Sequence, residues 1–417
     1  MAVMTGRSST WVRAQRRPKK ALFLSSPIGL GHARRDVAIA QELRKIHPDL
    51  HIDWLAQHPV TRVLADAGEP VHPASALLAN ESAHIEDESA DHDLHAFQAI
   101  RRMDEILVNN FMVFNDVVDE TYYDLVIGDE AWEVDYFLHE NPELKRFAFA
   151  WMTDFVGWLP MPQGGDAEAE LTADYNAEML EQRARYRRLR DRSIFVGNPE
   201  DVVDASFGAG MPRIRDWTEA NYDFAGYVTG FTPPTDDERA ALRRSLGLDA
   251  DDLLCVVTVG GSGVGDALLR RVMDAVGPAR RLRPELHFLV VTGPRIDPGS
   301  LPRRPGATVR GFIPDLYLAL SACDVAVVQG GLTTCMELTA AQRPFLSVPL
   351  ENHFEQNFHV RHRLANYGAG RCVRYAETGD AEALAAAIVT EVAREVRYRP
   401  VETDGAARAA ALLGELI

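Results

Sequence analysis

The sequence predicts an α/β protein made of two doubly wound domains, each with a parallel sheet covered by helices on both faces. A buried strand, a glycine-rich turn and an amphipathic helix follow one another over residues 21–43. The same order begins again at residue 253, and the length of 417 residues suits roughly two to three domains of about 150 residues each. Apolar residues make up 46% of the chain and charged residues 25%, which excludes a wholly disordered, collagen-like or coiled-coil protein.

The first half alternates expected strands with helical stretches. Apolar runs predict strands at 21–24, 51–55, near Val71, at 124–128 and at 146–150. Strands separated by helices form parallel sheets, so we expect an N-terminal domain over 21–228. Residues 1–20 contain six Lys and Arg and no acid, and we expect them to form a disordered basic arm.

The second half repeats this pattern after a short linker. We place the linker at 229–239, where two prolines precede a Thr-Asp-Asp-Glu segment that is typical of a helix cap. The C-terminal domain is then expected over 240–417. Its expected strands are 253–259, 287–293, 308–311, 325–328 and 345–348, and its last expected helix, rich in alanine, is 383–396.

Charge and cysteine usage limit the partners and the location. The chain carries 44 Lys and Arg against 61 Asp and Glu, a net charge of −17, which argues against nucleic acid as the main partner. Four widely spaced cysteines without a CxxC pair favour reduced thiols and a cytoplasmic protein. No apolar run approaches the length of a membrane span, and residues 1–20 do not resemble a signal peptide.

A turn in the second half has the features of an anion site. Gly330 and Gly331 follow the buried strand 325–328, and Thr333 or Thr334 is expected to cap the next helix. The free amides and partial positive charge of that helix end suit a diphosphate. Glu337, about one turn into the helix, is placed to accept hydrogen bonds from ribose hydroxyls. The alternative is an ordinary strand-to-helix turn with a favourable acid in its first helical turn.

Two further segments of the second half could contact the same ligand. Gly261 and Ser262 lie in a glycine-rich loop after strand 253–259, where backbone amides can reach phosphate oxygens. This loop lacks the G-x-G-x-x-G register of a nicotinamide site. Glu355, Gln356 and Asn357 follow strand 345–348 and offer donors and acceptors for sugar hydroxyls, although a hydrated loop with a helix cap is the plainer reading.

Histidines elsewhere in the sequence do not predict a metal site. His353, His359 and His362 fit no tetrahedral ligand spacing and spread around a helix. The segment Asp91-His-Asp-Leu-His95 only loosely resembles a metal cluster, in an acidic stretch expected to be a mobile acceptor loop over 80–105. We therefore predict that the protein holds no metal ion.

A histidine in the first half has the placement of a general base. His32 follows Gly29 and Gly31 at the carboxyl end of the first strand, where α/β sheets bind ligands. A helix start disfavours imidazolium, so we expect a neutral imidazole with a pKa near neutrality. Asp129 ends another parallel strand and is expected to orient His32. The alternative is a histidine that caps a turn.

Taken together, these residues resemble the GT-B glycosyltransferases. The resemblance is closest to glycosyltransferase family 28, the group that includes the peptidoglycan lipid-intermediate N-acetylglucosaminyltransferase, and it extends to the UDP-glycosyltransferase superfamily. It covers both halves and is densest over 309–370. The segments that carry it are Arg310-Gly-Phe-Ile-Pro-Asp-Leu, Ala322-Cys-Asp-Val-Ala-Val-Val-Gln-Gly-Gly-Leu-Thr-Thr-Cys-Met-Glu, Pro344-Phe-Leu-Ser-Val-Pro and Glu355-Gln-Asn.

The resemblance implies two Rossmann-like domains that face a central cleft and a role for each motif. Backbone at Phe312 and Ile313 would hold the nucleobase, the Gly330–Thr334 turn the diphosphate, and Glu337 the ribose. Glu355, Gln356 and Asn357 would touch the donor sugar. Gly29 and Gly31 would form the acceptor-side loop, with His32 as the base and Asp129 as its partner. Plant and animal members of the superfamily have a histidine where this chain has Gln329, so neutral donors would stabilise the phosphates here.

The expected activity is inverting, metal-independent transfer of a hexose or N-acetylhexosamine to an acceptor hydroxyl. The donor would be a UDP- or dTDP-linked sugar, a co-substrate rather than a cofactor, and the acceptor a small molecule or a lipid-linked compound. The aromatic segment 151–162 suits an apolar acceptor pocket, and the six arginines of 183–192 suit anionic headgroups or a solvated helix face, so peripheral contact at the inner face of the membrane is one alternative. Other readings are a UDP-sugar 2-epimerase and a non-catalytic nucleotide-sugar-binding subunit.

Overall fold

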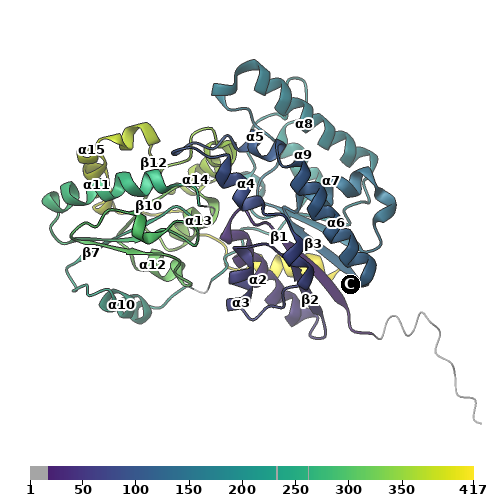
Figure 1. The fold of residues 1–417 in the computed structure, drawn as a ribbon, viewed down its shortest axis with the longest axis horizontal. Helices are drawn as coiled ribbons and strands as arrows, with labels where there is room; N and C mark the ends of the chain where they lie inside the picture. Colours follow the sequence, from purple (N-terminus) through teal and green to yellow (C-terminus); the bar gives the residue numbers. More distant parts are fainter. Residues whose placement is uncertain (1–16, 232, 262) are drawn as a thin grey trace, which may run out of the picture.

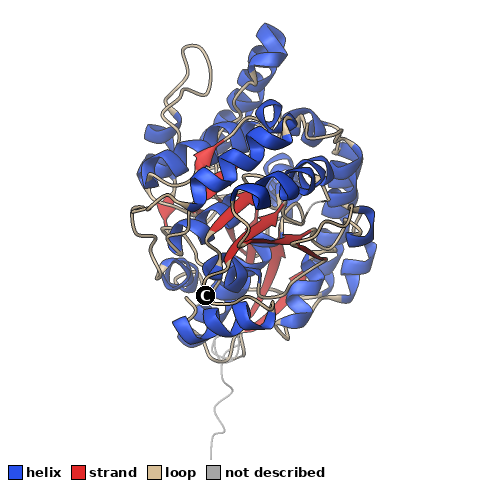
Figure 2. Ribbon diagram, turned by 90° about the vertical axis from the view of Figure 1, so that its left-hand side faces the viewer, coloured by secondary structure: helices blue, strands red, loops and turns tan. Residues whose placement is uncertain are grey.

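The chain forms two α/β lobes that lie side by side (Figure 1). The computed structural model describes residues 17–231, 233–261 and 263–417. In each lobe a six-stranded parallel sheet has helices on its faces (Figure 2). The predicted fold class, two doubly wound domains, is therefore confirmed.

The first sheet has the strand order β2-β1-β3-β4-β5-β6. Its strands are β1 (Lys20–Ser25), β2 (His51–Leu55), β3 (Leu125–Asp129), β4 (Ala148–Thr153), β5 (Arg192–Phe195) and β6 (Asp223–Phe224). Val71 forms an isolated parallel bridge with Trp54 beside β2. The strands expected at 21–24, 51–55, 124–128 and 146–150 are present as β1 to β4, whereas the short strand expected near Val71 is only this bridge. β5 and β6 were not predicted, because they are too short to show a pattern.

Helices on both faces of this sheet complete the first lobe. They are α2 (Leu30–Ile46), α3 (Val60–Asp66), α4 (Glu81–Asp87), α5 (Ala96–Arg101), α6 (Asp104–Glu120), α7 (Trp132–Glu140), α8 (Gly165–Arg185) and α9 (Ile214–Asn221). Apolar side chains of the strands point alternately into two clusters, one beneath α2 and one beneath α6 and α7.

The second sheet has the strand order β12-β11-β10-β7-β8-β9. Its strands are β7 (Leu253–Thr258), β8 (Leu286–Val291), β9 (Ala307–Arg310), β10 (Val325–Val328), β11 (Phe345–Ser347) and β12 (Arg371–Cys372). Its helices are α10 (Asp236–Ser245), α11 (Asp266–Leu282), α12 (Leu316–Ala322), α13 (Leu332–Ala340), α14 (Arg361–Tyr367) and α15 (Ala381–Val392). The alanine-rich helix thus ends four residues earlier than the sequence suggested.

The chain crosses between the lobes twice, once through the linker before α10 and once before the last helix. Thr235 caps α10 in a capping box with Glu238, as the sequence predicts. The last helix, α16 (Gly405–Gly414), returns to the first lobe, where its yellow ribbon lies beside α2 in Figure 1. Ala409, Ala410 and Leu413 are buried in the core of that lobe. The expected C-terminal domain of 240–417 is therefore too long, because a small apolar helix face does not reveal which lobe it packs on.

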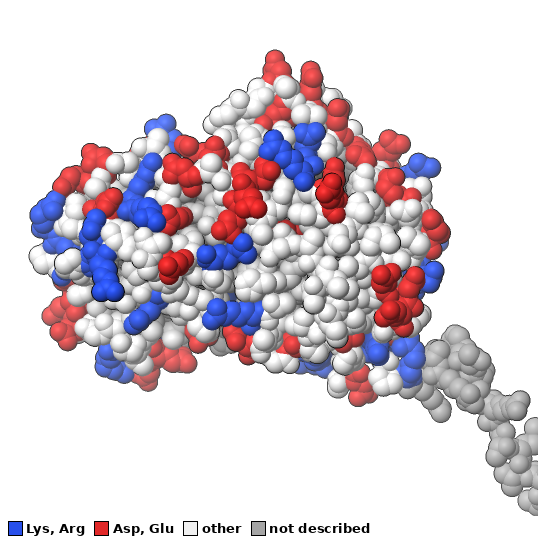
Figure 3. Space-filling view, viewed as in Figure 1, with Lys and Arg blue, Asp and Glu red and all other residues white. Residues whose placement is uncertain are grey.

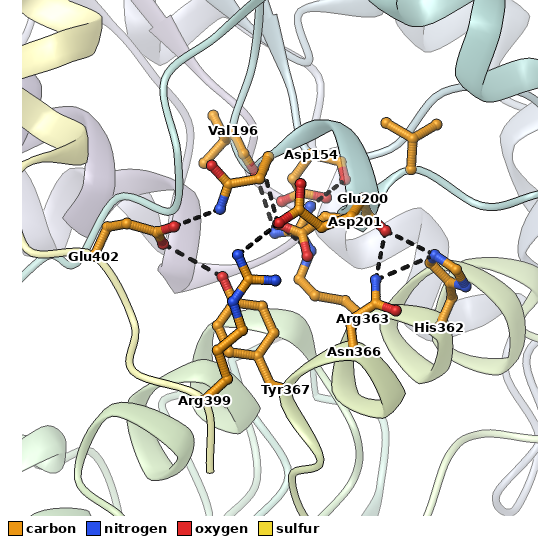
Figure 4. A network of polar contacts seen from close by, with 12 residues as sticks. Asp154, Val196, Glu200, Asp201, His362, Arg363, Asn366, Tyr367, Arg399 and Glu402 are labelled. Atoms are coloured by element: carbon orange, nitrogen blue, oxygen red, sulfur yellow. Dashed lines mark hydrogen bonds and ion pairs between the residues drawn. The ribbon is translucent and has the colours of Figure 1, made fainter.

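A buried arginine joins the two lobes (Figure 4). Arg363 of α14 donates hydrogen bonds to the carbonyl oxygens of Val196 (3.0 Å) and Asp154 (3.1 Å), both in the first lobe. His362 Nε2 donates to the carbonyl oxygen of Glu200 at 2.9 Å. These bonds satisfy a charged group that would be costly to bury alone, and they fix how the two lobes meet.

Two expectations about arginine-rich segments are not met in the residues that the structure describes. Residues 1–16 of the predicted arm lie outside the described residues, but Arg17 pairs with Asp124 at 2.7 Å and Lys20 is already part of β1. The other segment is no continuous basic face, because α8 ends at Arg185 and both Arg183 and Arg190 are buried. On the face shown in Figure 3, basic and acidic side chains are interspersed over both lobes.

The acidic stretch 80–105 bridges the lobes instead of forming a mobile loop. It contains α4 and α5, and its buried residues Ile85 and Phe97 share a core cluster with Phe354 of the second lobe. Glu86 also forms an ion pair with Arg295 across the lobes.

Within residues 17–231, 233–261 and 263–417, no helix is long and apolar enough to cross a membrane.

Candidate active site

Each sheet presents its topological switch point to the same cleft. The strand order reverses between β1 and β3 in the first lobe and between β7 and β10 in the second. Ligands of open parallel sheets bind at the carboxyl ends of strands at this point. A cleft of about 210 Å³ lies here, and it is lined by Gly31 and His32 from one lobe and by Gln329, Thr333 and Glu337 from the other.

The first lobe places a histidine and an aspartate in direct contact. His32 lies in the first turn of α2, which begins at Leu30 after the extended Gly29. His32 Nδ1 donates to Asp129 Oδ2 at 3.0 Å, and Asp129 is fully buried at the end of β3. The bond holds the imidazole in one orientation and leaves Nε2 free to exchange a proton with a ligand. The structure thus brings together the two residues that the sequence predicted.

A buried arginine that the sequence analysis missed binds the same aspartate. Arg35 donates from Nε to Asp129 Oδ2 at 2.8 Å and from Nη2 to Asp129 Oδ1 at 2.5 Å. It also pairs with Asp154, the residue that follows β4. Arg35 lies three residues after His32, so both side chains share one face of α2. That spacing is the signal that could have identified it.

The balance of charges makes His32 more basic than the sequence suggested. Burial and the Arg35 guanidinium act to lower the pKa of His32, but Asp129 and Glu130 outweigh both and raise it to about 9. For Asp129, burial is overcome by Arg35 and His32, which hold the pKa of its carboxyl well below the usual range. The prediction of a near-neutral imidazole is therefore wrong, because the two nearby carboxylates outweigh burial and the Arg35 guanidinium.

Three carboxyl groups gather in front of His32. Glu130 Oε2 lies 3.9 Å from His32 Nε2, and Glu130 has a left-handed backbone with φ of 52°, an unusual conformation for this residue. Burial, together with Asp154, raises the pKa of Glu130 to about 7. Burial, Asp154 and Glu130 likewise raise the pKa of Glu355 to about 8. These groups can hold or pass protons near neutral pH.

The same cluster has a spacing that could hold a metal ion. Ligand atoms of His32, Glu130 and Asp154 all lie within 4.8 Å of one another. Arg35 already neutralises Asp154, and a guanidinium at this position opposes a second cation. His353, His359 and His362 are not part of any such group among the described residues; His359, for example, binds the carbonyl oxygen of Gly157.

Each histidine of the acidic stretch 80–105 contacts a different partner. His84 Nε2 donates to the carbonyl oxygen of Ala99 at 2.9 Å, and His92 Nε2 donates to that of Val348 at 3.0 Å. His95 Nε2 pairs with Glu168 at 2.7 Å. They do not converge on one point, so the loose cluster suggested by their spacing in sequence is not formed.

The second lobe supplies a helix end that faces the cleft. Gly330 has φ of 105°, a conformation that favours glycine, and Gly331 is the N-cap of α13. Thr333 and Thr334 lie in the first turn of α13 and line the cleft. Neither threonine caps the helix, which corrects the sequence-based expectation. The first turn of α13, with its free amides and the partial positive charge of a helix N-terminus, therefore lies at the cleft.

The remaining donor-side predictions lie around this turn. Glu337, Phe312, Ile313 and Gly261 line the cleft, whereas Ser262 lies outside the described residues. Burial raises the pKa of Glu337 to about 7, against the opposing charge of Arg34. The guanidinium of Arg62, from the first lobe, lies 4.2 Å from the centre of the Phe312 ring.

Several predicted polar contacts serve the protein itself. Gln329 lines the cleft, but its Nε2 donates to the carbonyl oxygen of Val264 at 2.9 Å and so holds the glycine-rich loop. Gln356 accepts from the Leu350 amide at 2.9 Å. Asn357 donates to the carbonyl oxygens of Leu350 (2.8 Å) and His353 (2.9 Å) and does not line the cleft. Gly330 does not line the cleft either. Gly330 and Asn357 therefore support the residues that line the cleft.

Known proteins resemble part of this chain. Residues 254–411 match the model of the glycosyltransferase family 28 C-terminal domain. An uncharacterized glycosyltransferase of Methanosarcina acetivorans is 29% identical over 34% of this chain and 35% of its own length. A UDP-N-acetylglucosamine--N-acetylmuramyl-(pentapeptide) pyrophosphoryl-undecaprenol N-acetylglucosamine transferase of Anaeromyxobacter sp. is 31% identical over 38% of this chain and 41% of its own length. The matches thus span less than half of these relatives.

Solved structures show similarity over nearly the whole chain. The spinosyn rhamnosyltransferase SpnG aligns with a TM-score of 0.58 and 16% identity, covering 95% of both chains. The glycotransferase of kitacinnamycin aligns with a TM-score of 0.57 and 16% identity, covering 96% of this chain and 95% of its own. At this level of identity the likeness concerns the fold. The chain therefore has the GT-B fold, and its C-terminal domain resembles that of glycosyltransferase family 28.

Proposed function

We propose that this protein is a glycosyltransferase that moves a hexose or N-acetylhexosamine from a UDP- or dTDP-linked sugar to an acceptor hydroxyl. One observation carries the proposal: His32, oriented by Asp129, and the N-terminus of α13 line the same cleft from opposite lobes. The family 28 match supports a nucleotide-sugar donor in the C-terminal half. SpnG, whose fold is similar, has been solved with thymidine diphosphate.

The chemistry needs a base, a stabilised leaving group and an aligned acceptor. In the proposed reaction, Nε2 of neutral His32 takes the proton of the acceptor hydroxyl, and the oxygen attacks the anomeric carbon. The bond from that carbon to the diphosphate breaks in the same displacement, so the product has the inverted anomeric configuration. The amides of Leu332–Thr334 and the α13 dipole would stabilise the charge that grows on the diphosphate.

The charged partners of His32 set when it can act as a base. With a pKa of about 9, the imidazole of the free protein is mainly protonated at neutral pH. Arg35 opposes this effect, because its positive charge favours the neutral imidazole. We assign Arg35 the role of a positioning residue that fixes Asp129 and keeps His32 from becoming still more basic.

Metal independence is part of the proposal. A helix end can stabilise a leaving diphosphate without a cation. The group of His32, Glu130 and Asp154 is the place where a cation would otherwise bind, and the ion pair between Arg35 and Asp154 disfavours it.

The donor nucleoside would bind to residues of the second lobe that line the cleft. Glu337 would contact the ribose, and Phe312 and Ile313 would contact the nucleobase.

The test first identifies the donor and then the product. UDP- and dTDP-linked sugars are screened for an increase in the melting temperature of the protein, and cell extract is then incubated with the stabilising donor and analysed by mass spectrometry. A new compound heavier by one sugar residue, with inverted configuration by NMR, supports the proposal. A changed sugar nucleotide without any acceptor would instead identify a 2-epimerase. Tight donor binding with neither reaction would identify a non-catalytic binding subunit.

A further inference from the structure

A second cavity, larger than the cleft, lies within the first lobe. Its volume is about 490 Å³, within the usual range of small-molecule sites, about 300–1,000 Å³. It lies among α5, α6, α7, α8 and the end of β4. Its lining is rich in aromatic side chains, among them Trp132, Tyr136, Trp151, Phe155 and Tyr175. The segment 151–162 thus does contribute to a cavity, although Trp151 belongs to β4 and not to a loop.

This cavity adjoins the cleft that contains His32. Ile100, Trp132 and Phe155 line both spaces. The ring of Trp132 lies 4.9 Å from that of Trp151 and 5.9 Å from that of Phe155, so the three form one aromatic wall. Trp132 follows Glu130 by two residues, which places this wall next to the carboxyl group in front of His32. The cavity therefore lies beside the cleft, with Trp132 and Phe155 at their shared boundary.

The charged groups around the cavity do not suit an anionic ligand. Arg190 is bound to Asp135 through two hydrogen bonds of 2.6 and 2.5 Å and donates a third to the Tyr222 hydroxyl at 2.9 Å. Its positive charge is therefore already neutralised. At the rim, Arg101 stands against two acids, Asp104 and Glu178. Among the described residues, Arg101 donates only to the Tyr175 hydroxyl and to Gln98, so it is a lining cation without an ion pair. With Asp104 and Glu178 beside it the charge of the rim is still net negative, which disfavours a diphosphate.

The mouth of the cavity exposes apolar surface. Val108, Tyr136 and Tyr175 are 47%, 43% and 37% exposed, although each is a large hydrophobic residue. All three line this cavity. Grouped exposure of this kind is typical of a surface that is covered when a ligand binds.

We infer that this cavity binds a flat, uncharged ring system that carries a hydroxyl group, and that it does not bind a diphosphate-linked lipid. Aromatic walls bind such rings by offset or edge-to-face contact, and an acidic rim selects against anions. That the occupant is the sugar acceptor rests on the transferase function proposed above. The ring would lie against Trp132 and Phe155 with its hydroxyl directed toward His32.

The experiment compares two probes that share one ring system, of which one carries a neutral hydroxyl and the other an anionic phosphate. Isothermal titration calorimetry at pH 8, without any nucleotide sugar, measures binding of 2-naphthol and of 2-naphthyl phosphate to the full chain. We expect 2-naphthol to bind saturably and at least about tenfold more tightly than the phosphate, since the net negative rim disfavours a desolvated anion. Equal or tighter binding of 2-naphthyl phosphate would overturn the inference, as would displacement of 2-naphthol by phosphatidylglycerol vesicles.

Variants assign the binding to this cavity. Tyr136→Ala removes a ring at the mouth and should weaken 2-naphthol binding by roughly three- to tenfold, the usual effect of one aromatic contact. Tyr122→Ala removes an exposed tyrosine outside the cavity and should leave binding unchanged. The pair Asp104→Asn and Glu178→Gln should tighten binding of 2-naphthyl phosphate only. Insensitivity to all of these changes would place the probe elsewhere and refute the inference.

These measurements also separate the inference from the proposed function. Binding of 2-naphthol does not require transfer, so intact binding in a protein without transferase activity would contradict only the proposed function. Transfer to an acceptor in a protein whose cavity rejects 2-naphthol would contradict only the inference.

Discussion

Gly31 in the first lobe and Thr333 in the second are packed so closely that a side chain on Gly31 would overlap the Thr333 hydroxyl oxygen. The contact brings the first turn of α2, which contains His32, against the first turn of α13. A similar approach occurs between Leu30 and Gly261, where a Cβ would lie 2.8 Å from Leu30 Cγ. The base and the helix end can therefore act on one small ligand because glycine lets the two lobes meet.

Gly31→Ala should impair both donor binding and turnover, because the added methyl group must push Thr333 and the α13 turn away from the cleft. We expect an increase in donor KM and a fall in kcat, measured by product formation under varied donor concentration. The matched control is Gly277→Ala in α11, where the nearest atom would lie 3.9 Å from the new Cβ and kinetics should not change. Wild-type kinetics in Gly31→Ala would show that the close approach is not needed.

His32→Ala should reduce kcat by roughly 10²–10⁴-fold, the usual contribution of a positioned base. Donor binding should remain nearly intact, because the residue acts on the acceptor. Turnover and donor affinity are measured separately, by product formation and by calorimetry. His51→Ala, which alters an exposed histidine on β2, serves as the control. Full turnover in a folded His32→Ala protein would exclude this base.

Activity should rise with pH up to about 9, because only the neutral imidazole can accept a proton and the pKa of His32 is raised to about 9. The profile of log kcat/KM reports the coupled group of His32, Glu130 and Glu355 and not one residue alone. Asp129→Asn removes a charge that raises the pKa of His32, so the rising limb should move to lower pH while the maximum rate falls. A profile that is flat between pH 6 and 9 would contradict the assignment.

Glu337→Ala should raise donor KM with little effect on kcat, since a ribose contact lies away from the reacting bond. Donor affinity should also weaken below about pH 7 in the wild type, because burial raises the pKa of Glu337 to about 7 and the protonated group is a poorer acceptor. Calorimetric titration with UDP or dTDP at pH 6 and pH 8 measures both effects. Glu382→Gln, at an exposed residue of α15, should change neither.

A chelator should leave the transferase rate unchanged if the α13 helix end stabilises the leaving diphosphate. The assay is product formation before and after dialysis against EDTA, with Mg²⁺ or Mn²⁺ added back. Loss of activity that either ion restores would assign a metal to His32, Glu130 and Asp154 and would overturn the proposed metal independence.

Local patterns in the sequence predicted most of the fold and part of the site. Apolar runs such as 325–328 mark strands because a buried parallel strand needs continuous hydrophobic residues. Gly330 and Gly331 mark a tight turn because few other residues adopt its backbone. These features depend on neighbours in the chain, so they can be read without coordinates. The pairing of His32 with Asp129 followed from the rule that parallel strands end at one edge of a sheet.

Other features depended on contacts between distant segments. Arg35 became part of the site only because Asp129 and Asp154, from two different strands, both reach its guanidinium. Asn357 is not part of the site, because its side-chain amide donates hydrogen bonds to nearby backbone carbonyl groups. The short strand β5 follows several arginines, and the sequence does not show which of these arginines are buried.

The sequence by itself determined the two α/β units, the order of their strands along the chain and the glycine-rich turns, since these follow from local periodicity and backbone freedom. Only the tertiary structure decided the basicity of His32, the return of α16 to the first lobe and the aromatic cavity beside the cleft. Each of these arises from the summed charge or packing of residues far apart in the chain, and such sums depend on distances that local sequence does not contain.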